Sequence, residues 1–266
     1  ILIGLVGSEM CIRDSIRTAL QGQQGDRRLR LGIAGGEWKK MMADATARTR
    51  FASEVKKIIE QYDFDGVDFD FEWPANASEY NNYSATVIQM RSTLGKYVYF
   101  TASLHPVSFK ISPEAIDALD FISYQCYGPA VMRFPYEQFV KDGEAAVAYG
   151  IPKNKLVMGV PFYGSTGSLI AAYCDFVNDG LATTNEDTYT YKGNTYTFNS
   201  IETIRKKARY VCEEDYAGIM SWDLATDIDI TNNKSLLKVI KEEFEYYANP
   251  VSYTHLRAHE TDQYLV

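Results

Sequence analysis

Short apolar segments alternate along the chain with stretches whose apolar residues recur every three to four positions. The apolar segments have the length of strands, and the stretches between them have helical periodicity. This alternation begins near residue 29 and is typical of βα units that share a parallel sheet. The expected strands are 29–34, 64–73, 97–104, 121–127, 155–163 and 217–222.

Several helix ends are marked by residues with known capping preferences. Gly95 is expected to end one helix as a left-handed cap, and Ser112 with Pro113 is expected to begin the next. Ser200 is expected to cap a later helix, at 200–212. The first two apolar helix faces are formed by Phe51, Val55, Ile58, Ile59 and Tyr62, and by Tyr83, Val87, Met90 and Leu94.

Six strands of this kind predict an incomplete TIM-type (β/α)₈ barrel, with about six βα units that correspond to strands 3 to 8. Between the last two strands, a long polar loop is expected at 165–188, followed by a hairpin around Lys192-Gly193-Asn194.

The two ends of the chain differ in character from the middle. Residues 1–15 (ILIGLVGSEMCIRDS) and 251–266 (VSYTHLRAHETDQYLV) resemble translated adapter sequence, and we set them aside as a non-native leader and tail. A short native leader and tail is the alternative. We therefore expect one partial barrel domain at 16–250.

Composition and charge narrow the class of protein. A net charge of −8 argues against a nucleic-acid partner, which requires a basic surface. No stretch approaches the ~18 apolar residues of a membrane helix, so no membrane association is expected. Aromatic residues make up 14% of the chain, which fits either an ordinary core or stacking on sugar faces.

Neither a metal nor a cofactor is expected. The cysteines outside the two ends have no metal-ligand spacing, and we interpret them as structural. His105 has no evident partner in the sequence and is also interpreted as structural. The cysteines are Cys126, Cys174 and Cys212.

The most informative stretch is the second expected strand, where acidic and apolar residues alternate. Side chains of a strand alternate between its two faces, so the acids share one face and the apolar residues share the other. Carboxylates crowded on one face repel one another, which raises the pKa of at least one and keeps a proton available near neutral pH. The acids are Asp68, Asp70 and Glu72, and the apolar residues are Val67, Phe69 and Phe71.

Two non-catalytic interpretations compete with this one. The spacing of Asp63, Asp65 and Asp68 faintly suggests a calcium loop, but such a loop needs small flexible residues where this chain has bulky ones. The second interpretation is an acidic strand face that is exposed to solvent. The phenylalanines on the opposite face of the strand argue instead that the strand is buried. We favour catalysis, with Glu72 as the proton donor at the C-terminal end of the strand, where barrel enzymes place their active sites.

The acidic stretch resembles the DxxDxDxE signature of family 18 glycoside hydrolases, the chitinases and their relatives, at all four acidic positions, Asp65 included. Other segments resemble the family's motifs in the expected order over about residues 28–247. Ile33 and Gly128 depart from the family pattern, in which a serine and an acid are usual. The matching segments are Gly35-Gly36, Gln125-Cys126-Tyr127, Gly159 to Gly164 and Gly218 to Asp223.

The resemblance implies a retaining, substrate-assisted hydrolysis with no enzyme nucleophile. Glu72 would protonate the leaving oxygen while the substrate's acetamido carbonyl attacks the anomeric carbon; Asp70 would orient the acetamido nitrogen, and Tyr127 would bind its oxygen. The residues themselves agree, since Asp70 and Glu72 lie ~7 Å apart on one side of a strand and cannot flank a scissile bond. The resemblance further implies Asp68 and Asp65 as supporting residues, and Trp222, Tyr163, Gln125, Trp38 and Gly36 as substrate-binding residues.

Some of these assignments leave alternatives open. Tyr127 and Trp222 fit an ordinary core role as well, and Trp38 also fits a surface position. The small α+β insertion that deepens the groove of many chitinases is expected to be absent, which implies a shallower groove.

The expected substrate is chitin or an N-acetylglucosamine oligosaccharide, and the expected state is a monomer when full length. By resemblance, the location is secreted, cell-surface or periplasmic. Two alternative functions are an endo-β-N-acetylglucosaminidase acting on N-glycan chitobiose cores and a non-hydrolytic chitin-binding lectin. Retention of Glu72 argues against the lectin.

Overall fold

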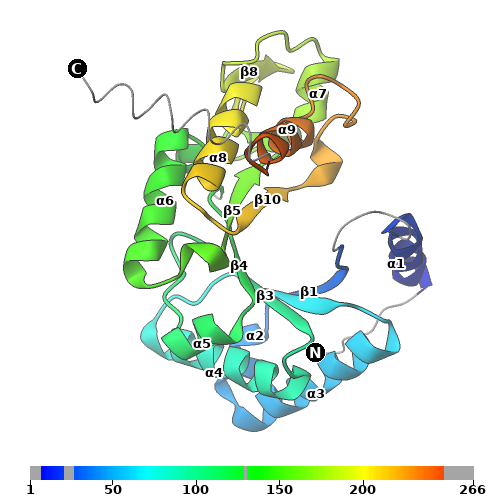
Figure 1. The fold of residues 1–266 in the computed structure, drawn as a ribbon, viewed down its shortest axis with the longest axis vertical. Coiled ribbons are helices and arrows are strands. Elements are labelled where there is room, and N and C mark those ends of the chain that lie inside the picture. The colour runs from blue at the N-terminus through cyan, green and yellow to red at the C-terminus, as the bar shows by residue number, and fades with distance from the viewer. Residues whose placement is uncertain (1–6, 21–26, 129–130, 249–266) are drawn as a thin grey trace. The chain divides into compact units, whose positions relative to one another are not determined.

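The computed structural model describes residues 7–20, 27–128 and 131–248 (Figure 1), and these divide into two compact units with the boundary between Ser123 and Tyr124. The predicted tail at 251–266 lies outside the described residues, as do residues 1–6 of the predicted leader. The rest of that leader begins helix α1 (Gly7–Leu20). The predicted domain boundaries stay a prediction.

The first unit consists of parallel strands in the order β1-β2-β3-β4, with helices between them in sequence. Each strand matches an expected one but is shorter. In the pairing registers, Ala34 lies opposite Asp70, and Asp68 lies opposite Thr101. The elements are β1 (Arg30–Ala34), α2 (Trp38–Ala43), α3 (Ala45–Gln61), β2 (Gly66–Asp70), α4 (Ala77–Leu94), β3 (Tyr99–Leu104), α5 (Pro113–Ala118) and β4 (Phe121–Tyr124).

Side-chain caps mark the starts of α3 and α5. Asp44 accepts a hydrogen bond from the Ala47 amide (2.7 Å), and Ser112 accepts one from the Ala115 amide (3.2 Å), as the sequence predicted for Ser112. Gly95 ends α4 with φ 79°, but its ψ of 178° is extended, so the predicted left-handed cap geometry is wrong. The positive φ still requires glycine there.

The second unit contains two parallel barrel strands, β5 and β10, which pair directly. Its helices α8 and α9 lie beside each other (Figure 1). The elements are α6 (Tyr136–Tyr149), β5 (Leu156–Pro161), β6 (Tyr163–Ser165), β7 (Ile170–Ala172), α7 (Tyr173–Asn178), β8 (Thr188–Tyr191), β9 (Asn194–Thr197), α8 (Ile201–Glu213), β10 (Gly218–Trp222) and α9 (Leu236–Ala248), with 3₁₀ turns at Val131–Arg133, Lys153–Lys155 and Leu224–Thr226.

Between β5 and β10 the chain forms a second, antiparallel sheet in the order β7-β6-β9-β8, which we call the small sheet. The predicted hairpin is confirmed: Lys192 (φ 48°) and Gly193 (φ 76°) form a two-residue turn that joins β8 to β9. The predicted polar loop at 165–188 is wrong, because it contains β7 and α7. The expected absence of an α+β element between the last two barrel strands is therefore also wrong.

The physical reason is an aromatic cluster. Phe176 of α7 is fully buried, and its ring centroid lies 5.4 to 5.7 Å from the rings of four residues on and beside β8 and β9. Burial of this ring holds α7 against the sheet. The four residues are Tyr189, Tyr191, Tyr196 and Phe198.

Candidate functional site

The carboxylate strand has the two faces that its sequence predicts. Phe69 and Phe71 are buried, at 0% and 1% exposure, and pack against Phe51 of α3 with centroids 5.8 and 6.2 Å away. On the other face, Asp68 and Asp70 are partly buried. Strand β2 ends at Asp70, so Glu72 lies two residues past its C-terminal end, where it is exposed.

Asp68 is held by groups from the two neighbouring strands. Thr101 of β3 donates a hydrogen bond to Asp68 Oδ1, and Ser103 of β3 donates one to Asp68 Oδ2 at 3.0 Å. Arg30 of β1 places a guanidinium nitrogen 3.4 Å from Asp68 Oδ1. Both carboxylate oxygens are thus bound, which fixes the Asp68 side chain beneath the acidic face.

The surroundings of Asp68 shift its pKa. Burial raises the pKa of Asp68, against the lowering effects of the Thr101 hydroxyl, the Arg30 charge and the Ser103 hydroxyl. The sequence predicted a raised pKa in this cluster from repulsion between carboxylates. At Asp68 the cause is burial instead.

Asp65 lies at the other end of the strand and has a structural environment. Its Oδ2 accepts a hydrogen bond from the Leu29 amide at 2.6 Å, and it pairs with Arg17 of α1 at 3.0 Å. These contacts hold the N-terminal end of β2 against the segment before β1. They suit the supporting role that the sequence assigned.

A group of side chains that the sequence reasoning did not single out supports the loop after Glu72. The hydroxyl of Tyr80 donates to Ser108 Oγ (2.9 Å), and Ser108 Oγ donates to the Pro74 carbonyl (2.6 Å). The ring of Trp73 lies 4.6 Å from that of His105. His105 is 1% exposed and its Nδ1 accepts from the Val107 amide (3.2 Å), in keeping with a structural role.

Trp38 is buried in the core rather than open to a sugar. It is 2% exposed at the start of α2, and its ring packs 5.9 Å from Phe71 and 6.2 Å, edge-on, from Tyr83. Both neighbours are core residues, so this burial contradicts the predicted substrate contact and also the surface alternative. Gly36 is exposed in the turn between β1 and α2.

In the second unit, the predicted sugar-binding residues lie at or just past strand ends. The rings of Tyr127 and Tyr163 meet almost at right angles, 6.4 Å apart, and the Tyr127 hydroxyl donates to Met220 Sδ at 3.4 Å. Trp222 ends β10 and is 53% exposed, while Gln125 is only 6% exposed. Tyr127 and Tyr163 therefore come together, and Trp222 is left about half exposed.

Two glycines shape the surroundings of these rings. A side chain at Gly159 would place a Cβ 2.8 Å from the Tyr127 ring, so glycine is needed there for Tyr127 to pack. Gly128 has φ 41°, and a Cβ on it would lie 3.2 Å from the Tyr163 hydroxyl. An acid at this position, which the family pattern usually has, would be strained here.

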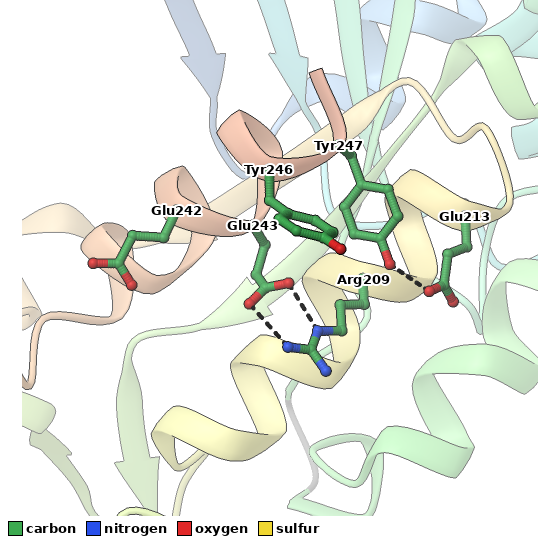
Figure 2. A pocket seen from close by; sticks show the side chains of 6 residues that line it. All are labelled: Arg209, Glu213, Glu242, Glu243, Tyr246 and Tyr247. Atoms are coloured by element: carbon green, nitrogen blue, oxygen red, sulfur yellow. Dashed lines mark hydrogen bonds and ion pairs between the residues drawn. The ribbon is translucent and has the colours of Figure 1, made fainter. Parts of the chain in front are cut away.

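One cavity of about 350 Å³ lies between α8 and α9 (Figure 2). The Arg209 guanidinium pairs with Glu243 at 2.8 Å, and the Tyr247 hydroxyl donates to Glu213. Its polar groups bind one another across the two helices, so we interpret the cavity as part of an interhelical clamp. The lining is completed by Glu242 and Tyr246.

Within the described part of the chain, no group of three or more His, Cys, Asp or Glu residues is arranged to hold a metal ion. The same residues include no helix long and apolar enough to cross a membrane.

The model of the family described as "Glycosyl hydrolases family 18" matches residues 18–227. The chain belongs to glycoside hydrolase family 18. It is 23% identical to "Probable chitinase 2" of Drosophila melanogaster over 82% of this chain and 60% of that protein. It therefore spans less than two thirds of the length of that relative.

Solved structures of the family resemble this chain in fold. A family 18 chitinase from the chitin utilization locus of Flavobacterium johnsoniae has a TM-score of 0.74 and 25% identity, over 87% of this chain and 79% of that one. A plant class V chitinase mutant from Cycas revoluta, in complex with (GlcNAc)3, has a TM-score of 0.74 and 19% identity, over 90% and 87%. The fold class is therefore that predicted: an incomplete (β/α)₈ barrel, with six barrel strands among the described residues.

Proposed function

We propose that this family 18 protein hydrolyses β-1,4 bonds in chitin or chitooligosaccharides. The observation that carries the proposal is the acidic face of β2, fixed by the hydrogen-bonded carboxylate of Asp68, with an exposed Glu72 two residues past the end of the strand. The chitinase names of the relatives support the same substrate class.

In the proposed reaction, Glu72 supplies and recovers the proton. Its carboxyl group protonates the glycosidic oxygen as the bond to the anomeric carbon breaks, and the substrate's acetamido oxygen bonds to that carbon. The Glu72 carboxylate then removes a proton from water, which attacks the anomeric carbon and opens the oxazolinium ring. Two displacements at one carbon retain its configuration.

Asp70 is proposed to accept a hydrogen bond from the acetamido N–H and to stabilise the positive charge of the oxazolinium. A fixed negative charge near a developing positive one lowers the barrier most in a site that excludes water. Asp68 is proposed to support the acidic face rather than to contact the substrate, because its two oxygens already accept hydrogen bonds from Thr101 and Ser103.

The second unit is proposed to supply substrate-binding groups. By family resemblance, Tyr127 donates to the acetamido oxygen, Trp222 forms the floor of the sugar subsite, and Tyr163 and Gln125 line it. The exposure of Trp222 at the end of β10 supports its assignment, since a sugar needs an accessible aromatic ring to stack on. A secreted location, action as a monomer and the absence of a cofactor are proposed on the same resemblance.

Two substrates test the proposal against its alternatives. We expect the protein to release the fluorophore from a fluorogenic chitobioside and to leave a high-mannose glycopeptide intact. The reverse result would indicate an endo-β-N-acetylglucosaminidase. Binding of chitotriose without cleavage of either substrate would indicate a lectin and refute the proposed hydrolysis.

A further inference from the structure

Lys207 of α8 is a charged side chain that the proposed reaction does not use. It is 0% exposed, and its ammonium donates hydrogen bonds of 2.7 Å to the Phe134 carbonyl and to Asn199 Oδ1. Both acceptors are neutral oxygens, and the ammonium also lies 4.9 Å from the centre of the Phe139 ring. Burying an ammonium against neutral groups costs free energy that an apolar side chain would not, so stability alone does not account for a lysine here.

The Phe134 carbonyl is the group on which the buried hydrogen bonds converge. It accepts one from Lys207 Nζ and another from Asn199 Nδ2 at 2.8 Å, and Asn199 is itself fully buried. A carbonyl oxygen has two lone pairs, so these two donors satisfy it completely. Phe134 directly follows the 3₁₀ turn Val131–Arg133, and the two donors hold its backbone in place just before α6 begins.

The side chain of Phe134 connects this anchored backbone to the proposed sugar site. Its ring is 1% exposed and meets the ring of Tyr163 almost edge-on, with the centroids 5.6 Å apart and an interplanar angle of 83°. Tyr163 also meets the ring of Tyr127, at 6.4 Å. Because packed interiors transmit small displacements, a shift of Phe134 would be passed on to Tyr163.

The charge on Lys207 is lost within the neutral pH range, because burial lowers its pKa to about 7. A neutral amine keeps two N–H donors and can still reach both oxygens, but its hydrogen bonds are weaker than those of an ammonium. Among the acidic groups that oppose the lowering, Asp142 is already paired with Arg133 at 2.7 Å. The opposing groups are Cys126 just past β4, Asp187 just before β8, and Asp142 and Glu137 of α6.

We propose that Lys207 is a positioning residue of the sugar site: by holding Phe134, it fixes the ring of Tyr163 where the substrate meets it. The inference rests on the proposed function, in which Tyr163 lines the sugar subsite. A ring that is already fixed loses less freedom when a sugar binds, so anchoring it strengthens binding. Because the ammonium anchors Phe134 more firmly than the neutral amine does, the affinity for sugar should fall as pH rises through about 7.

The pH dependence of chitotriose binding tests the proposal, with Glu72→Gln as the background so that the sugar is not cleaved. In this background, we expect the Kd measured by calorimetry to rise about fivefold from pH 6 to pH 8.5, the effect of one weakened hydrogen bond. Adding Lys207→Met should give the weaker affinity at both pH values. Adding Lys206→Met, at the exposed neighbouring position, is the matched control and should keep the pH dependence.

Phe134→Leu separates positioning from stability and does not depend on whether Lys207→Met folds. It keeps the backbone carbonyl and both of its donors, so Lys207 still titrates, but it removes the ring that meets Tyr163. In the Glu72→Gln background, this variant should lose the pH dependence of chitotriose binding and keep the pH dependence of urea unfolding that comes from Lys207.

Two results would overturn the inference and leave Lys207 with a structural role alone. One is a pH dependence of chitotriose binding that persists in Phe134→Leu, and the other is its absence from the Glu72→Gln background itself. Binding with the expected pH dependence, but without cleavage of the chitobioside by the wild type, would refute the proposed hydrolysis and support the positioning role. Failure of the wild type to bind chitotriose at any pH would refute both.

Discussion

In strand β2 and in the small sheet, aromatic residues alternate with residues of a second kind, and this second kind differs between the two regions. In both, one face is aromatic and is buried against a helix, through Phe51 of α3 or Phe176 of α7. The other face of β2 carries carboxylates, whereas that of the small sheet carries neutral hydroxyls. Clustered carboxylates repel one another, which costs electrostatic free energy but makes the face chemically reactive. Threonine hydroxyls form hydrogen bonds without that cost and without that reactivity.

The two regions are also anchored by ionisable groups of opposite sign. Asp68 receives hydrogen bonds from two hydroxyls beneath the acidic face. Lys207 of α8 is fully buried and donates to the Phe134 carbonyl and to Asn199 Oδ1, both at 2.7 Å, just past the end of β9. Burial raises the pKa of Asp68 and lowers that of Lys207, so the stabilities of the two regions should respond to pH in opposite directions.

The largest expected effect follows from removing the acid. Glu72→Gln should lower kcat on the fluorogenic chitobioside by about 10³-fold with little change in chitotriose binding, because the proton is needed mainly in the transition state. Glu60→Gln, an exposed substitution on α3, serves as the control and should leave kcat unchanged. If Glu72→Gln loses binding and rate in equal measure, Glu72 is structural, and the contrast between a reactive β2 and an unreactive small sheet fails.

Asp70→Asn should have the next largest effect, a loss of about 10²-fold in kcat with the fold intact. The amide keeps the shape of the carboxylate but loses the charge that stabilises the oxazolinium. Circular dichroism would check the fold. Proton NMR of the first product from chitohexaose should show the β-anomer, and an initial α-anomer would mean inversion by water and exclude the substrate-assisted reaction.

The acidic face could be predicted from sequence because its signal is local. Five consecutive alternations from Val67 fix which residues share a face, and the structure has the same division. The hydrogen-bond partners of Asp68 are harder to predict from the sequence, because Thr101 and Ser103 come 33 and 35 residues later. Their one signal is that they alternate as polar residues within an otherwise apolar strand.

Two of the features predicted wrongly depend on distant contacts. Trp38 follows two glycines in an exposed turn, which suggested an open position, but its ring is covered by Tyr83, 45 residues later. The segment 165–188 is polar enough to suggest a loop, and β7 and α7 form there because Phe176 is buried among tyrosines of the following hairpin. Tertiary burial overrode local composition in both cases.

Asp68 should make the first unit less stable as pH rises. Its raised folded pKa means that the folded state holds a proton that the unfolded state has lost, so its contribution is greatest below the unfolded pKa and declines as pH rises through the folded one. Asp68→Asn should remove this decline, as measured by urea unfolding between pH 4 and 8. Asp117→Asn, at an exposed position of α5, should keep it.

Asp68→Ala tests the hydrogen bonds rather than the charge. It leaves the hydroxyls of Thr101 and Ser103 without their acceptor, and should cost about 1–3 kcal/mol of unfolding free energy near neutral pH. A smaller loss than that of Asp68→Asn would mean that the hydroxyls do not depend on the carboxylate.

Lys207 should have the opposite pH dependence in the second unit. Burial lowers the pKa of Lys207 from 10.5 to about 7, against the raising effects of nearby acidic groups, so between these values the unfolded chain binds a proton that the folded chain lacks. The free energy of unfolding should therefore rise with pH from about 7 to 10.5, by an amount on the order of a few kcal/mol. The groups that oppose the lowering are Cys126, Asp187, Asp142 and Glu137.

Lys207→Met would remove this rise and also leave the Phe134 carbonyl and Asn199 Oδ1 without their donor. The variant should be less stable at pH 9.5 than the wild type, with a smaller difference at pH 7, where the buried ammonium is already costly. The exposed neighbour Lys206→Met is the matched control and should keep the wild-type pH dependence. If the Lys207→Met and wild-type curves run parallel from pH 7 to 10, Lys207 stays charged in the fold, and the contrast between the two anchors is lost.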